Sequence, residues 1–275
     1  DGVEFHSSEK RATFLGAAGK KEEVSRCSHF RFARQKAGYA AFYLIRRGKN
    51  FSLRYAESKD ALRWKVRQSV AGMRQPAIFV EGAEGNNGLA YGGAKAIHVG
   101  RATGIKEWKF DSKSALKPRR NFFDSGALLP AASWQHNQEI VLLYYSKRGL
   151  GKNAVWSLGA ARFNITDPSR PIWRSETALW NQPSEMLSRA WEPVGIAASG
   201  GLLYLYWQDQ DNGEILLAES LFPWIEQFVR SAPSRQLLDR YEGNPLLAPV
   251  FEREWESQAV FNPAAIYENG QVHLL

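Results

Sequence analysis

The 275-residue sequence predicts an all-β chain with the fold of a five-bladed β-propeller, of which four blades are complete and a further unit is begun. The first observation behind this prediction is an internal repeat, in which an apolar strand-like stretch leads to a tryptophan four times along the chain. The second is the composition, because 23 Gly, 10 Trp, 10 Tyr and 15 Phe favour strands and tight turns. The third is a hairpin pattern at the C-terminus that starts another unit of the same kind.

Each copy of the repeat holds enough residues for a small sheet, which is one blade of a propeller. The apolar stretches are residues 39–45, 89–92, 140–145 and 202–207, and the tryptophans that follow are Trp64, Trp108, Trp173 and Trp224. A single small sheet cannot bury both of its faces, whereas sheets packed radially can, and we expect the tryptophans to fill the wedges between them. A β-sandwich would also supply many strands but predicts no repeat of this length.

A further apolar segment precedes each copy and is expected to supply the inner strand of its blade. These four segments are residues 30–32, 77–80, 127–132 and 194–198. The first 26 residues are polar and weakly patterned, which predicts a poorly defined strand or tail. At the other end, residues 260–267 and 271–275 are predicted to be two strands, with Asn-Gly in the turn between them.

The composition argues against several classes of protein. Hydrophobic residues make up 44% and charged residues 23%, as in ordinary globular proteins, and a lone cysteine, Cys27, excludes a disulfide scaffold. No apolar run in the sequence is long enough to span a membrane. The net charge of +8 comes from scattered Lys and Arg residues, which favours a solvated surface over a nucleic-acid groove. We therefore expect neither a membrane nor a nucleic acid as partner.

A compound motif lies at the end of the chain. It comprises Asn244–Pro249, Trp255-Glu256, Ala259–Ala265, Gly270 and His273–Leu275. These residues and their spacings resemble the opening of glycoside hydrolase family 130, whose members are five-bladed propellers that cleave or phosphorolyse β-mannosides. The resemblance implies an oligosaccharide or other glycan as partner. It also implies inorganic phosphate as co-substrate if the protein is a phosphorylase, and no other cofactor.

The residues before this motif resemble, more loosely, the wider set of five-bladed glycosidase propellers. Arg74–Val80 is similar to the inner strand that carries Arg-Asp-Pro in fructosidases and arabinosidases, and Phe123–Pro130 is similar to another inner strand. Ala56–Asp60 followed by Trp64 matches a recurrent blade ending. One position departs from the pattern, because Gln75 replaces the expected acid and cannot serve as a general base or nucleophile.

The resemblance divides the chain into three parts. Residues 1–230 are expected to form a glycosidase-like propeller, residues 231–243 a linker, and residues 244–275 the truncated start of a family-130-like propeller. Alternatively, the last segment belongs to the fifth blade of the first propeller. We expect the chain to be a piece of a longer protein, with the catalytic aspartate of family 130 beyond its end. The compartment stays open, with the cytoplasm as the first expectation.

Glycoside cleavage takes two carboxyl groups, one on each side of the scissile bond. The resemblance to family 130 phosphorylases implies a single acid, with phosphate as the attacking group. In a propeller these groups must lie on inner strands or their loops. Asp124 and Glu192, close to the inner strands of the third and fourth blades, are therefore the candidate catalytic residues, and Asp209 and Asp211 come next. The segments around Asp124 and Asp209 are also good turn sequences, in which the carboxylate accepts backbone N–H bonds.

Sugar sites combine aromatic platforms with polar groups, because one face of a pyranose is apolar. Trp191 is one possible platform, and the candidate substrate-binding residues are Arg74, Gln75, Trp134, His136, Trp207, Asp209 and Asn262. Because the chain has ten tryptophans, a place in the core is favoured for each of them, and Asn262 also suits a turn before Pro263. No metal site is expected, because the five histidines show no i, i+4 pair.

The sequence thus predicts a carbohydrate-active protein, a glycosidase or glycoside phosphorylase that acts on β-mannosides or related glycans. The alternative is a non-catalytic propeller that binds a glycan or a protein, which Gln75 favours because an amide replaces the expected acid. A basic, nucleic-acid-binding propeller is the third and least favoured reading. The sequence does not identify the sugar or the oligomeric state.

Overall fold

The computed structural model of the protein describes residues 12–16, 19–35, 38–82, 88–103, 107–187, 189–199, 202–221, 265–268 and 271–274. The chain divides into two units, Asp1–Ala232 and Pro233–Leu275, and each is described by itself. Within the described ranges the structure consists of strands, three short 3-10 turns and connecting segments, without an α-helix. Nor do these ranges contain a helix of the length and hydrophobicity needed to cross a membrane.

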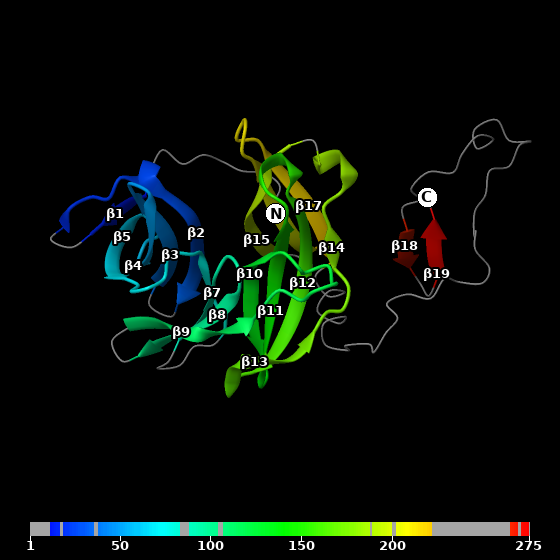
Figure 1. The fold of residues 1–275 in the computed structure, drawn as a ribbon, viewed down its shortest axis with the longest axis horizontal. Coiled ribbons are helices and arrows are strands. Elements are labelled where there is room, and N and C mark those ends of the chain that lie inside the picture. The colour runs from blue at the N-terminus through cyan, green and yellow to red at the C-terminus, as the bar shows by residue number, and fades with distance from the viewer. Residues whose placement is uncertain are drawn as a thin grey trace, which may run out of the picture. The chain divides into compact units, whose positions relative to one another are not determined.

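Four sheets follow one another along the first unit, and each consists mainly of consecutive antiparallel strands (Figure 1). The first sheet has the order β1-β5-β4-β3-β2, with β1 (Thr13–Leu15), β2 (Cys27–Gln35), β3 (Gly38–Arg47), β4 (Asn50–Ser58) and β5 (Arg63–Ser69). The second has the order β6-β7-β8-β9, with β6 (Ala77–Phe79), β7 (Leu89–Gly92), β8 (Ile97–Thr103) and β9 (Glu107–Leu116). The short 3-10 turn η2 (Val24–Arg26) leads into β2.

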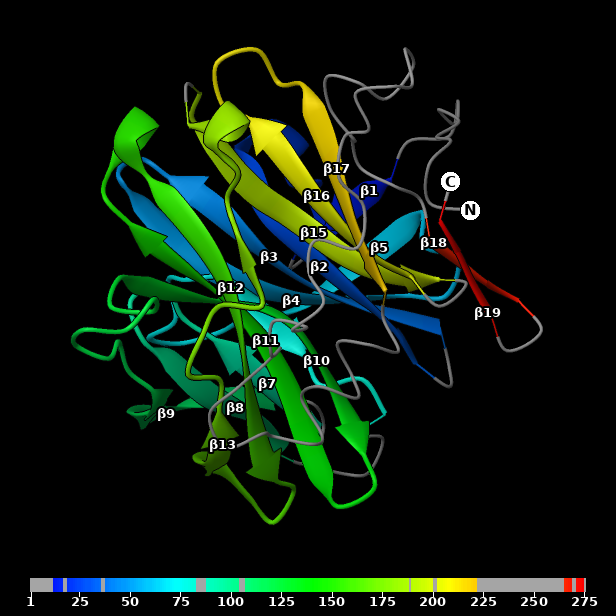
Figure 2. The same ribbon diagram turned by 90° about the vertical axis from the view of Figure 1, so that its right-hand side faces the viewer.

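The third and fourth sheets complete the arrangement. The third contains β10 (Ala127–His136), β11 (Glu139–Arg148), β12 (Val155–Asn164) and β13 (Asp167–Arg174), and β14 (Trp180–Asn181) also pairs with β12. The fourth contains β15 (Trp191–Ser199), β16 (Leu202–Asp209) and β17 (Ile215–Leu221). The turns η3 (Gly151–Asn153) and η4 (Ser184–Met186) lie between these strands. The all-β prediction and the four-bladed propeller arrangement are confirmed, and Figure 2 shows the third and fourth sheets toward the viewer.

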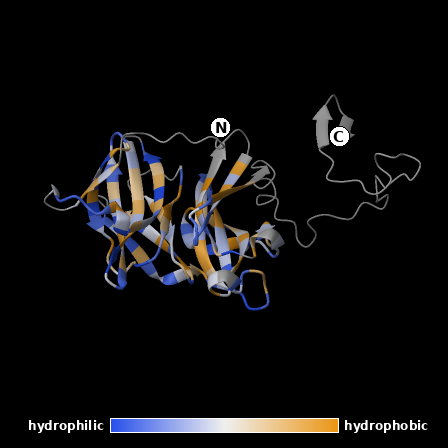
Figure 3. Cartoon of the chain, turned by 90° about the horizontal axis from the view of Figure 1, so that it is seen from above, coloured by the Kyte–Doolittle hydropathy of each residue, from blue (hydrophilic) through white to orange (hydrophobic). Residues whose placement is uncertain are grey.

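An apolar layer fills the space between each pair of consecutive sheets, and β11 contributes to two of these layers. Ile140 and Leu142 belong to the layer shared with the second sheet. Val141 and Leu143 belong to the layer shared with the fourth sheet. The alternation follows from strand geometry, because successive side chains point to opposite faces of a sheet. Figure 3 shows the result as hydrophobic, orange segments within the strands.

Trp108 confirms the packing role expected of the repeat tryptophans. Its side chain is 4% exposed, and its ring centroid lies 5.0 Å from that of Phe42 in the first sheet and 5.8 Å from that of Phe79 in the second. Trp64 is buried as well and stacks on Phe14 of β1. β1 pairs in parallel with β5, so part of the weakly patterned N-terminal segment supplies an edge strand. Trp224 lies outside the described residues.

The described part of the second unit is a hairpin. β18 (Ala265–Glu268) pairs in antiparallel fashion with β19 (Gln271–Leu274), and Glu268 is opposite Gln271. β19 lies within the predicted segment 271–275, and β18 overlaps the predicted segment 260–267 and extends one residue beyond it, to Glu268. The predicted linker, the Asn244–Pro249 motif and Asn262 lie outside the described residues.

Candidate functional site

The inner strands of the four sheets, β2, β6, β10 and β15, line a shared central cavity. Its volume is about 1140 Å³. Its wall includes His29 and Arg31 from β2, Trp134 from β10 and Glu192 from β15, and Glu81 follows β6 directly. Each of these strands overlaps one of the four predicted inner segments, and the cavity forms because the four strands converge.

Three of the four inner strands carry an irregularity at the cavity. The register shifts between Ser28 and Arg31 in β2, at Ala131 in β10, and at Val194 in β15. An extra residue in one strand leaves a backbone group without its ladder partner and redirects the neighbouring side chains. In β2 the residues between Ser28 and Arg31 include His29, whose φ of 54° lies in the left-handed region. The bulges therefore bring polar side chains and free carbonyl groups to the cavity wall.

Arg31 uses two of these carbonyl groups. Its Nη1 donates hydrogen bonds of 2.8 Å to the carbonyl oxygens of Phe30 and Val194. The second bond connects the first sheet with the fourth. A guanidinium that satisfies buried carbonyl oxygens forms charge-assisted bonds, which are stronger than neutral ones. Arg31 thus acts as a fixed part of the wall.

Glu192 lies at the start of β15, as the sequence predicts, and its carboxylate is paired with a lysine. Lys147 Nζ lies 2.9 Å from Glu192 Oε1 and 4.8 Å from the centre of the Trp156 ring. His29 lies close enough for Glu192 to affect it electrostatically. Burial and the neighbouring Arg31 lower the pKa of His29, and Glu192 opposes this effect. The cavity wall around Glu192 therefore combines its carboxylate, the Lys147 ammonium that pairs with it, and the neutral imidazole of His29.

Glu81 is a cavity residue that the sequence analysis missed. Its backbone N–H donates to the carbonyl of Ser133 at 2.9 Å, and its carbonyl accepts from Gln135 N–H at 2.7 Å, which fixes it beside β10. The side chain keeps solvent access, yet desolvation by the surrounding protein raises the pKa of Glu81 above its usual value. Its position directly after the predicted inner segment 77–80 was the available signal, because residues that end inner strands line a central cavity.

Glu81 and Glu192 line the cavity from different sheets. Glu81 is opposite Trp134 of β10, whereas Lys147, the partner of Glu192, is opposite Ala127 at the start of the same strand. The two side chains thus reach the cavity beside different parts of β10. Their surroundings also differ, because Glu192 is paired with Lys147 at 2.9 Å.

Aromatic side chains also line the cavity. Trp134, a predicted platform, is half-buried in the wall, and Tyr206 of β16 also lines it. Phe32 of β2 is 56% exposed and stacks on Phe30 with ring centroids 5.9 Å apart. Flat apolar rings beside polar groups are the surfaces that sugar rings pack against.

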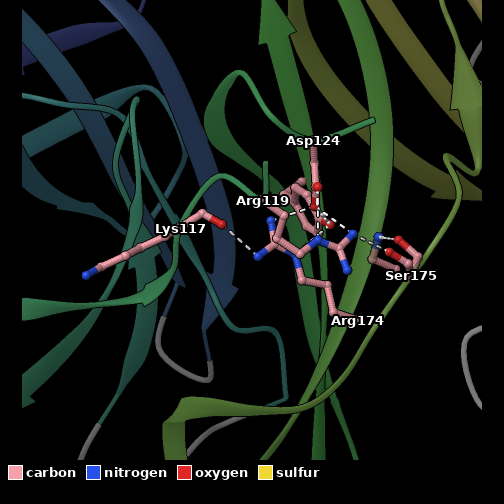
Figure 4. Close-up of polar contacts among 7 residues, drawn as sticks. Lys117, Arg119, Asp124, Arg174 and Ser175 are labelled. Carbon is pink, nitrogen blue, oxygen red and sulfur yellow. Dashed lines mark hydrogen bonds and ion pairs between the residues drawn. The ribbon is translucent and has the colours of Figure 1, made fainter. Parts of the chain in front are cut away.

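Asp124, a predicted catalytic residue, is a buried structural carboxylate. Its side chain is 0% exposed and lies 3.0 Å from Arg119 and 2.6 Å from Arg174 (Figure 4). The hydroxyl of Tyr144 donates a further hydrogen bond of 2.7 Å. Because all of these partners belong to the protein, the Asp124 carboxylate is withdrawn from any substrate. It holds the loop before β10 in place.

Asp209 has a similar structural position in the fourth sheet. Its side chain is 2% exposed, pairs with Arg189 at 3.3 Å and accepts the backbone N–H of Asp211 at 2.8 Å. This is the turn interaction that the sequence also allowed, and it places Asp209 outside the cavity wall. Asp211 lies exposed in the same turn.

The remaining predicted residues divide between core and surface. Trp207 is 0% exposed and packs on Trp180 with ring centroids 4.9 Å apart, and Trp191 is 5% exposed in the same core layer. Both therefore pack within the protein. Arg74 and Gln75 lie exposed before β6, and His136 ends β10, so none of these three belongs to the cavity wall.

Neither a metal nor a reactive thiol is indicated. The described ranges contain no group of three or more His, Cys, Asp or Glu side chains suited to hold a metal ion. Cys27 lines the cavity, but burial and the nearby Glu22 raise the pKa of its thiol to about 11, which keeps the thiol protonated and unreactive.

Comparison with known proteins places a short stretch of the chain beside curated enzymes. It is 55% identical over 38 residues to a 1,2-beta-oligomannan phosphorylase from Thermoanaerobacter sp. (strain X514). It is 51% identical over 37 residues to a beta-1,2-mannobiose phosphorylase from the same organism. Each stretch is 14% of this chain, and the chain spans 13% and 12% of those relatives. No family model matches the chain.

Solved structures resemble a much larger part of the chain. The β-1,2-mannobiose phosphorylase from Listeria innocua matches 74% of this chain and 61% of its own, with a TM-score of 0.61 and 13% sequence identity. A glycosyl hydrolase from Bacteroides ovatus matches 70% of this chain and 64% of its own, with a TM-score of 0.58 and 18% identity. The resemblance to the glycosidase propellers is therefore confirmed at the level of the fold.

Proposed function

We propose that the protein binds β-linked mannosides or related glycans in the central cavity and acts as a glycoside phosphorylase. The observation that carries this proposal is the cavity wall itself. It combines an aromatic ring, Trp134, with two acidic side chains, Glu81 and Glu192, on strands held by a propeller scaffold. The short identity to mannoside phosphorylases and the fold shared with them support the choice of substrate.

The different surroundings of the two carboxylates favour phosphorolysis over hydrolysis. A hydrolase uses two carboxyl groups around one bond, whereas Glu192 is already paired with Lys147 at 2.9 Å. A phosphorylase uses one acid. The acid protonates the glycosidic oxygen, the bond from that oxygen to the anomeric carbon breaks, and a phosphate oxygen forms the new bond to that carbon. The products are mannose 1-phosphate and the shortened glycan.

Glu81 is the group we propose as the proton donor. A general acid must hold its proton near the working pH, and desolvation shifts the pKa of Glu81 upward, in the direction that this role needs. Glu192 is instead held in an ion pair with Lys147 at 2.9 Å. We therefore assign Glu192 to the orientation of sugar hydroxyl groups.

The experiment is product analysis with the full chain. β-1,2- and β-1,4-mannobiose are incubated with the protein, with and without phosphate, and mannose 1-phosphate and mannose are measured. We expect mannose 1-phosphate only when phosphate is present, and a loss of at least about 100-fold in Glu81→Gln, because a general acid contributes 10²–10⁴-fold. Absence of both products overturns the enzymatic proposal.

A non-catalytic, glycan-binding propeller is the second candidate function. Two observations favour it: Gln75 is an amide where the related families carry an acid, and Asp124 is fully engaged in the protein interior. This candidate predicts that mannobiose binds without turnover, and that Glu81→Gln leaves the affinity unchanged.

We also propose that the complete ring has five blades. The first sheet carries a second apolar cluster, which includes Phe14, Tyr43 and Trp64, apart from the layer that it shares with the second sheet, and this cluster offers a surface for another sheet. The 54 residues after β17 are comparable in length to one repeat. Truncation after Ala232 tests whether this chain supplies that blade. If it does, the melting temperature of the first unit falls; if a second propeller begins there, it is unchanged.

A further inference from the structure

A second, shallower hollow lies beside the loop that precedes β10. Its volume is about 780 Å³, and its wall includes Arg120, Phe122 and Arg148. Both arginines are exposed, and Phe122 is 42% exposed. Within the described ranges, neither arginine is paired with a carboxylate. We call this feature the arginine hollow, because its charge comes from these two guanidinium groups.

Ion pairs and hydrogen bonds anchor the loop that forms the hollow. Asp124 binds Arg119 and Arg174, and Arg174 Nη1 donates to the carbonyl of Lys117 at 2.7 Å, as Figure 4 shows. The backbone N–H of Phe122 donates to the carbonyl of Arg119 at 3.3 Å. The Arg119 guanidinium also lies 4.3 Å from the centre of the Phe122 ring. Arg120 and Phe122 are therefore presented by a loop whose anchoring groups are already satisfied.

The other arginine is placed by β11. Arg148 ends that strand, next to Lys147, whose ammonium binds Glu192 at the cavity. Successive side chains of a strand point to opposite faces, so Lys147, which binds Glu192 of the cavity wall, and Arg148, which lines the hollow, lie on opposite faces of the third sheet. Gly126 allows the loop and the strand to meet, because a Cβ on Gly126 would lie only 2.1 Å from the Lys147 carbonyl oxygen. The two sites thus lie on either side of one strand end.

We propose that the arginine hollow binds the carboxylate of an acidic sugar unit in the glycan whose neighbouring units occupy the central cavity. This inference rests on the function proposed above and extends it to acidic glycans. Guanidinium groups bind carboxylates through two parallel hydrogen bonds, and the exposed Phe122 ring supplies a surface for the apolar face of the sugar. The arginines select the charged glycan, whereas the central cavity binds its backbone.

Two matched oligosaccharides test the proposal. A β-1,4-mannuronate oligosaccharide and the β-1,4-manno-oligosaccharide of equal length differ only at C6, which is a carboxylate in the first and a hydroxymethyl group in the second. Calorimetric titration of the full chain should give at least tenfold tighter binding of the acidic oligosaccharide. This preference should weaken as salt is raised, because salt screens exposed charges.

Variants separate this inference from the function on which it rests. Arg120→Ala combined with Arg148→Ala should abolish the preference and leave the affinity for the neutral oligosaccharide unchanged. Arg47→Ala, an exposed arginine of the first sheet, is the control and should change neither affinity. Equal affinities in the unaltered protein, or a preference that survives in the double variant, overturn the inference alone. Failure of both oligosaccharides to bind overturns the proposed function as well.

Discussion

The guanidinium of Arg31 donates a hydrogen bond of 2.8 Å to the carbonyl oxygen of Val194, and this bond joins the inner strands of the first and fourth sheets. The same nitrogen donates to the carbonyl of Phe30, also at 2.8 Å. Both acceptors lie at interruptions of their β-ladders. One side chain thus satisfies two carbonyl groups that the bulges leave without ladder partners. It also connects the first and fourth sheets at the central cavity.

Arg31→Leu should lower the free energy of unfolding by about 1–3 kcal/mol, the cost of leaving partly buried carbonyl acceptors without their donor. Arg34→Leu is the matched control, because Arg34 lies exposed on the same strand, and its effect should stay within about 0.5 kcal/mol. Urea unfolding of both variants measures the difference. Equal stabilities would contradict a linking role for Arg31.

Asp124→Asn should be the more damaging change. The substitution removes the negative charge between two arginines at a position that is 0% exposed, and breaking a buried ion pair costs about 3–5 kcal/mol. Glu176→Gln, at an exposed position after β13, is the control and should cost less than about 0.5 kcal/mol. A small effect of Asp124→Asn in denaturant unfolding, together with lost turnover of mannobiose, would instead restore Asp124 as a catalytic candidate.

Glu81 gives the stability of the protein a specific pH dependence. Burial raises the pKa of Glu81 in the folded state above its value in the unfolded chain. The folded state therefore binds the proton more tightly, and stability falls as pH rises through the ordinary range of glutamate toward the raised pKa. Melting temperatures of the wild type and Glu81→Gln should coincide near pH 3, and the variant should be the more stable one at pH 8. A gap of opposite sign, or one independent of pH, would refute this.

Gly126 should not tolerate a side chain. In Gly126→Ala the new Cβ would lie 2.1 Å from the Lys147 carbonyl oxygen, so the loop or the strand must move. Overpacking of this kind costs about 1–3 kcal/mol. Gly195 lines the central cavity, and a Cβ added there would have its nearest neighbour, an atom of Tyr206, 3.9 Å away. Gly195→Ala therefore serves as the control and should change stability little. Thermal unfolding compares the two, and equal melting temperatures would show that the contact at Gly126 is loose.

Much of the fold could be predicted from the sequence, because propeller blades repeat. The apolar stretch 140–145 identifies β11, and the segment 127–132 identifies β10, since strands buried on both faces are continuous apolar runs. Trp108 is predicted as a wedge residue and packs as one. These features depend on local pattern, which a single sequence displays.

The site was less predictable, because it depends on contacts between blades. Asp124 and Glu192 occupy similar places near inner strands, yet one is buried between arginines and the other lines the cavity. The difference is made by Arg174, which lies 50 residues from Asp124 along the chain. Arg31 and Glu81 were missed for the same reason, since bulges and partners on other sheets decide which inner-strand residues face the cavity.

The central claim is that the cavity formed by β2, β6, β10 and β15 is the glycan site. Calorimetric titration of β-1,2-mannobiose into the full chain, the Trp134→Ala variant and a control tests it most directly. The control is Phe51→Ala, because Phe51 is an exposed aromatic residue on β4 outside the cavity wall. The account predicts that Trp134→Ala weakens binding at least tenfold and that Phe51→Ala leaves it unchanged. Equal affinity of all three proteins, or no binding by the unaltered chain, would contradict it.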